Sequence, residues 1–157
     1  NKRVENTTTD DRDVIAMATN NMNEGVISVF FIRNGKMIGR EHFHMTGVQS
    51  ESYGDIMAAF LKQYYASTPF LPKEIILEHE VNEQELIEQY LSERRGNLVH
   101  ILTPQKGDKA KLLKLARDNA FLVLTQDTEK LKREQARTEG AAKELAELIG
   151  IPSAKRL

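Results

Sequence analysis

Residues 26–45 read Val-Ile-Ser-Val-Phe-Phe-Ile-Arg-Asn-Gly-Lys-Met-Ile-Gly-Arg-Glu-His-Phe-His-Met, and this stretch predicts a β-hairpin. Its first part, 26–32, is rich in β-branched and aromatic residues, which is typical of a buried strand. Asn34-Gly35 is the dipeptide that best tolerates the positive φ angles of a tight hairpin turn. The return strand alternates apolar and polar residues, so we expect one covered face and one wet face. Its apolar residues are Met37, Ile38, Phe43 and Met45.

The sequence around the hairpin predicts an α/β domain. A short apolar strand is expected at 14–18, which gives three antiparallel strands. Helices and strands then alternate, because Pro and Gly separate apolar runs of helical and of strand length. The expected elements are a helix at 52–66, a strand at 74–78, a helix between Asn82 and Gly96, a strand at 98–102, and one long helix, or two stacked end to end, at 108–149. This order matches the ribonuclease-H-like fold, a mixed five-stranded sheet of order 3-2-1-4-5 with a long C-terminal helix.

Apolar spacing also predicts which helix faces are buried. For the first helix these residues are Ile56, Met57, Phe60, Leu61 and Tyr64. For the second they are Leu86, Ile87, Tyr90 and Leu91, with Asn82 as the N-terminal cap and Gly96 as the end. Each helix is therefore expected to cover the sheet with a single stripe.

The composition limits the possible classes of protein. The chain has 157 residues, 40% of them apolar, which is enough for the core of one domain. It carries a net charge of −1 and no cysteine, so a globally basic DNA binder, disulfides and thiolate metal sites are excluded. No apolar run reaches membrane-spanning length and no signal peptide is visible, so we expect a cytoplasmic location.

Metal-dependent nuclease chemistry needs several converging carboxylates to hold two divalent ions. The expected first strand contains no acid, and Asp10, Asp11 and Asp13 precede it. Glu78, at the end of the fourth strand, is the one acid in a catalytic position. It is interpreted as a solvated strand end, or alternatively as a metal ligand together with the Asp10 to Asp13 group.

Two histidines, His42 and His44, are spaced to share one face of the return strand. They are interpreted as part of a wet strand face, and the alternative is a two-point metal site. No phosphate-binding glycine loop and no Ser or His arrangement for a nucleophile is present, so the sequence predicts no catalytic residue and no metal ligand.

Positive residues gather at two places, and both are candidate phosphate contacts. The alternative is ordinary solvated surface. The candidates for DNA contact are Arg33, Lys36 and Arg40 around the hairpin turn, and Lys106, Lys109, Lys111 and Lys114 at the start of the long helix.

Four stretches of the chain resemble the central region of the UvrC family, whose members are subunits of the excision-repair nuclease. The stretches are 11–16, 29–43, 71–77, and Pro104-Gln105-Lys106-Gly107-Asp108-Lys109 with the following Leu112-Leu113. The resemblance extends from about residue 11 to the end of the chain.

The resemblance implies a place in a larger protein. In the family, this region follows a helical hairpin that binds UvrB and precedes a ribonuclease-H-like domain that makes the 5′ incision with divalent metal. The chain stops before the first catalytic aspartate, so no catalytic position is carried over. We expect residues 1–12 to be a linker, 13–125 a degenerate ribonuclease-H-like domain, and 126–157 an extended helix and connector to the catalytic domain.

Three hypotheses about function follow. In the first, the domain is noncatalytic and supports dual incision, the 5′ incision especially, with damaged DNA, UvrB and neighbouring UvrC domains as partners and no cofactor of its own. In the second, the segment is itself a metal-dependent nuclease. In the third, it only docks other protein domains.

Overall fold

The computed structural model describes residues 11–148; most of the expected linker and the end of the expected connector lie outside the described residues. Arg12, which we placed in the linker, is the first residue of strand β1. In chain order, the elements are β1 (Arg12–Thr19), β2 (Glu24–Arg33), β3 (Lys36–Thr46), a 3₁₀ turn η1 (Val48–Ser50), α2 (Tyr53–Ser67), β4 (Glu74–Ile76), α3 (Gln84–Arg95), β5 (His100–Leu102) and α4 (Asp108–Leu148).

The five strands form one mixed sheet in the predicted order β3-β2-β1-β4-β5. β1 pairs antiparallel with β2, and β2 with β3, whereas β4 is parallel to both β1 and β5. The hairpin turn lies where the sequence places it, with positive φ angles of 53° at Asn34 and 75° at Gly35. The ribonuclease-H-like order of elements is therefore confirmed.

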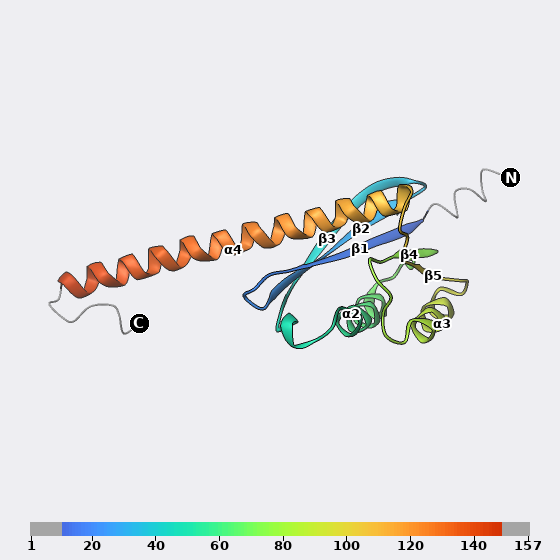
Figure 1. Ribbon diagram of the computed structural model, residues 1–157, viewed down its shortest axis with the longest axis horizontal. Helices are drawn as coiled ribbons and strands as arrows, with labels where there is room; N and C mark the ends of the chain where they lie inside the picture. The colour runs from blue at the N-terminus through green and yellow to red at the C-terminus, as the bar shows by residue number, and fades with distance from the viewer. Residues whose placement is uncertain (1–10, 149–157) are drawn as a thin grey trace.

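The helices cover the two faces of this sheet (Figure 1). Side chains alternate across a strand, so Ile15 faces α2 and α3 while its neighbours Val14 and Ala16 face α4. The α2 side holds the larger cluster, with fully buried Met57 and Leu61. Burying a side chain of this size stabilises the fold by about 1.5–3 kcal/mol.

Helix α4 is a single element that crosses the sheet and then runs far beyond it (Figure 1). Its core contacts with the strands run from Leu113 to Leu124. The most distal ion pair between its described side chains and a strand joins Asp127 Oδ2 to His44 Nε2, 3.0 Å apart. The following part, 128–148, would span about 30 Å at 1.5 Å per residue.

Strand β3 differs from the prediction at its first half. Met37 and Ile38 are 45% and 66% exposed, although we expected both on the covered face. The register between β2 and β3 shifts between Phe31 and Ile32, so the hairpin contains a bulge beside Ile38. A bulge breaks the alternation of side chains and bends the strand away from its neighbours. Phe43 and Met45, beyond the bulge, do pack on the core as predicted.

Helix α3 buries fewer of its apolar residues than their spacing predicted. Ile87 and Leu91 are buried, but Leu86 and Tyr90 are 61% and 41% exposed. The prediction failed because α3 packs mainly against α2 and the short strand β5, and one narrow stripe suffices for those contacts.

Asn82 is not the N-terminal cap of α3. That position is Glu83, which has a left-handed backbone and makes no capping hydrogen bond with its side chain. The Asn82 amide donates instead to the Asp55 carboxylate of α2. Gly96 ends the helix with φ of 79°, as predicted.

Candidate nucleic-acid interface

The carboxyl ends of the parallel strands β4 and β5 border a small hollow of about 230 Å³. In open α/β sheets, ligands bind at this edge, because loops from neighbouring parallel strands converge there. Helix α4 forms the opposite wall. The lining residues are Glu78, His79, Pro104, Gln105, Ala110, Leu113, Lys114 and Arg117.

Glu78 is held by groups of this chain. Its side chain is 10% exposed, so the interpretation as a solvated strand end is wrong. One oxygen, Oε1, accepts a hydrogen bond of 3.0 Å from the backbone amide of Met17 in β1. The other, Oε2, lies 3.6 Å from Nη1 of Arg117. Both carboxylate oxygens are thus directed at donors of the protein.

Asp13 corrects the expectation that the first strand contains no acid. It is the second residue of β1 and is 1% exposed. The Tyr65 hydroxyl donates a 2.6 Å hydrogen bond to Oδ2, and Arg33 Nη1 lies 3.0 Å from Oδ1. Burial raises the pKa of Asp13 above its usual value, while Tyr65 and Arg33 partly oppose this rise.

These two acids lie on opposite faces of the sheet. Asp13 contacts Tyr65 of α2, whereas Glu78 contacts Arg117 of α4, so they cannot share a metal ion. Within residues 11–148, no group of three or more His, Asp or Glu side chains is placed to hold a metal. Asp11 instead accepts, through Oδ1, a hydrogen bond from the backbone N–H of Asn34. Asp11, Asp13 and Glu78 are therefore not assembled into one ligand set.

His42 and His44 lie on β3 with their rings 5.5 Å apart, edge to face. The spacing correctly placed both on one face, where His44 contacts Asp127 of α4. Within residues 11–148, these three side chains do not form a group that could hold a metal ion. Both side chains are exposed, as expected for a wet strand face.

Three of the predicted basic candidates already contact acids of this chain. Arg33 lies beside Asp13 and stacks over the Phe70 ring, 4.4 Å from its centroid. Lys109 Nζ lies 3.0 Å from Glu74 Oε1. Lys114 pairs with Asp118 one helical turn on, 3.1 Å away, but both side chains are more than half exposed. Only Lys114 of the three keeps a surface position from which it could reach a phosphate.

The other basic candidates are exposed or nearly so, and none forms an ion pair with another residue of 11–148. They are Lys36, Arg40, Lys106 and Lys111. Because each retains a solvated charge, they stay candidates for DNA contact.

Arg117 is a candidate that the sequence analysis missed. It lies one helical turn after Lys114, on the same side of α4, and its side chain is 55% exposed. The spacing of basic residues at 111, 114 and 117 along one helix could have indicated Arg117 as a candidate. Its proximity to Glu78 could not be predicted, because the two residues are brought together only by the fold. His79 and Gln105 complete the polar wall of the hollow.

Tyr53 lies behind this edge, with its ring 5.0 Å from that of His79. Burial and the nearby charge of Glu78 raise the pKa of Tyr53 to about 12, so the phenol stays protonated at neutral pH. The edge thus contains a partly buried acid, a partly buried neutral phenol, the exposed Arg117, and the exposed Lys114 paired with Asp118. The exposed guanidinium and ammonium groups are of the kind that contact phosphates.

The strand order and the layers define this chain as a ribonuclease-H-like domain. Ribonuclease H2 from Pyrococcus horikoshii superposes with a TM-score of 0.59 over 89% of each chain, at 12% identity, which supports the fold alone. A family model described as the UvrC Ribonuclease H-like domain matches residues 11–127. The chain belongs to the UvrC family.

Two relatives named UvrABC system protein C are similar over nearly the whole chain. The protein from Lachnospira eligens is 50% identical over 93% of this chain, and that from Alkaliphilus oremlandii 45% over 90%. This chain spans 24% and 22% of their lengths. Among the described residues, no helix is both long and apolar enough to cross a membrane.

Proposed function

We propose that this chain is a noncatalytic ribonuclease-H-like module of a UvrC subunit, which supports dual incision of damaged DNA, the 5′ incision especially. One observation carries the proposal. At the sheet edge where a nuclease of this fold gathers carboxylates, Glu78 is bound by the Met17 amide and lies beside Arg117. The module then acts by position, holding DNA, UvrB or a neighbouring UvrC domain.

The DNA contact in this proposal lies on the first turns of α4. Lys111 and Lys114 are exposed there, and Lys106 precedes the helix. Lys109 is left out, because its contact with Glu74 ties the helix start to β4. Cations that contact phosphates release counterions, so the affinity they provide falls as salt rises.

The test is binding of the purified chain to a duplex containing an unpaired bubble, measured by fluorescence anisotropy at several salt concentrations. A variant with Lys106, Lys111 and Lys114 all changed to Gln loses three charges. The matched control changes Lys130, Lys132 and Arg133 to Gln, which lie on the distal part of α4. We expect the first variant to lower the slope of log affinity against log salt by about 0.9 for each phosphate that the lysines no longer neutralise.

Equal losses in the two variants would show general charge attraction and contradict a contact surface at the helix start. No binding by the wild-type chain at low salt would favour a scaffold that contacts only protein domains. The nuclease alternative has its own assay: metal-dependent cleavage by the wild-type chain that Glu78→Ala abolishes would overturn the noncatalytic assignment. No metal is assigned to this segment, and divalent metal remains an expectation for the catalytic domain of the family.

A further inference from the structure

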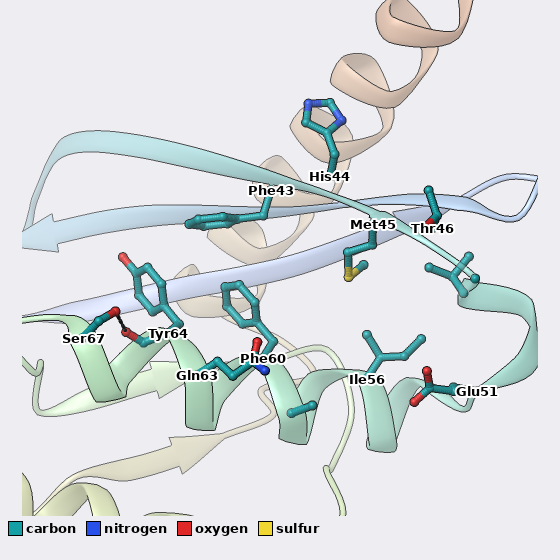
Figure 2. Close-up of a pocket in the computed structure, with 13 residues that line it drawn as sticks. Phe43, His44, Met45, Thr46, Glu51, Ile56, Phe60, Gln63, Tyr64 and Ser67 are labelled. Carbon is teal, nitrogen blue, oxygen red and sulfur yellow. Dashed lines mark hydrogen bonds between the residues drawn. The ribbon is translucent and has the colours of Figure 1, made fainter.

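A groove of about 510 Å³ lies between β3 and α2, on the sheet face opposite α4. Figure 2 shows Met45 of β3 directed toward α2, with Ile56 and Phe60 rising from the helix to meet it. His44, between Phe43 and Met45 in the strand, points away to the other face. The size and the apolar walls are those of a binding groove.

The aromatic wall of this groove is already ordered by its own contacts. The Phe43 ring lies 5.3 Å from Phe60 and 5.5 Å from Tyr64, in edge-to-face geometry. Phe60 and Tyr64 stack at 5.3 Å. The Tyr64 hydroxyl donates to Glu41 Oε1 at 3.1 Å. Because these rings are held before any ligand arrives, a ligand would lose little free energy in ordering them.

Strand β3 also offers a free edge along the groove. It is the outermost strand of the sheet, so the backbone groups of its outer side pair with no other strand of the described region. The bulge that protects such an edge lies near Ile38, at the hairpin end. From Gly39 to Thr46 the pairing with β2 is regular, and the last part of this stretch, Phe43 to Thr46, borders the groove. An added strand could therefore pair with it.

The acidic character of the groove indicates which kind of partner could bind there. Its lining contains Glu51 and no Lys or Arg, and Glu41 lies beside it through Tyr64. Nucleic acid is disfavoured here, because its phosphates would meet carboxylates and no cation. A peptide with apolar residues and a basic residue fits both the walls and the charge.

We propose that this groove binds an extended segment of a partner protein, which adds a strand to β3. Every second side chain of the segment enters the groove between Phe43, Met45 and Phe60, and a Lys or Arg lies next to Glu51. This interaction is independent of the proposed DNA contact, which lies on α4.

The probe is a fluorescein-labelled peptide in which Val, Ile and Phe alternate with Ser and Thr, with one Lys at each end. The variant Ala59→Arg places a long cation in the groove from an exposed position of α2. Its matched control is Ala66→Arg, on the same helix, exposed and outside the groove. We expect Ala59→Arg to weaken binding at least about tenfold and Ala66→Arg to leave it unchanged, with both variants melting like the wild type.

Two further arms test the charge and the strand pairing. Glu51→Lys should reverse the preference, so that a peptide with Glu ends binds better than the peptide with Lys ends. A peptide with N-methylated alternate amides cannot pair as a strand and should lose binding.

Binding that survives both Ala59→Arg and N-methylation would overturn the proposal, as would no binding of any probe. Sedimentation of the chain alone provides the last arm. A dimer that Ala59→Arg disrupts would assign the groove to a second copy of this chain and overturn the partner segment.

Discussion

Replacing Tyr65 by Phe should destabilise the fold by about 2 kcal/mol at neutral pH. The change removes one hydroxyl and leaves the ring in place, so no large cavity forms. That hydroxyl is fully buried and donates to Asp13 at 2.6 Å. A hydrogen bond contributes about 0.5–1.5 kcal/mol between neutral groups and about 1.5–3 kcal/mol to a charged one, and an acceptor left buried without its donor adds a desolvation cost of about 1–3 kcal/mol. Urea unfolding followed by circular dichroism measures the difference.

The matched control is Tyr64→Phe, the same change at the next position. The Tyr64 hydroxyl donates to Glu41 in a partly exposed contact, so we expect a loss below about 1 kcal/mol. Equal losses in the two variants would refute the reasoning that burial of Asp13 sets the cost.

The pKa of Asp13 predicts how the stability lost in Tyr65→Phe changes with pH. The folded pKa of Asp13 lies above the ordinary value of 3.8, because burial outweighs Tyr65 and Arg33. Its titration therefore stabilises the folded state fully below 3.8, and this contribution is lost as the pH rises through the folded pKa. Tyr65→Phe removes a contact that favours the charged form, so the folded pKa rises further. The deficit of the variant should grow with pH, and a constant deficit would contradict this account.

Two other predictions concern α4. Leu113 lies in the core between α4 and the sheet, so Leu113→Ala should lower the free energy of unfolding in urea by about 2–5 kcal/mol. Leu131 is half exposed beyond the sheet, so Leu131→Ala should change it by less than about 0.5 kcal/mol. Similar losses in the two variants would contradict the separation of the two halves of the helix. In hydrogen exchange measured by mass spectrometry, peptides from 128–144 should exchange much faster than those from 113–124, since most helical stability in proteins comes from packing and the core contacts of α4 with the strands end at Leu124. Equal protection of the two segments would contradict this account.

The sequence was most informative where periodicity is long or a turn is chemically specific. The hairpin at Asn34-Gly35, the order of the strands and the long last helix follow from apolar patterns that neighbouring elements only reinforce. The family was likewise visible in local motifs. These features need no knowledge of which residues meet across the sheet.

Features that depend on distant partners were not predictable. Asp13 precedes an apolar run and so was placed outside the strand, because its partners Arg33 and Tyr65 lie 20 and 52 positions away in the sequence. Arg117 could be recognised as a candidate site residue only from the fold, which places it beside Glu78. The basic candidates were found by charge alone, and whether any of them contacts DNA stays a prediction.

The charges at the sheet edge bear on the proposed DNA contact. In a metal-dependent nuclease, the charge of bound ions offsets that of the carboxylates that hold them. If the ions are absent, unpaired carboxylates at that edge would repel the phosphates of DNA. Here Glu78 is bound to the Met17 amide and lies beside Arg117, and Lys114 stands one helical turn away. Arg117 and Lys114 thus offset the charges of Glu78 and Asp118 at this edge, and the proposed DNA contact requires that balance.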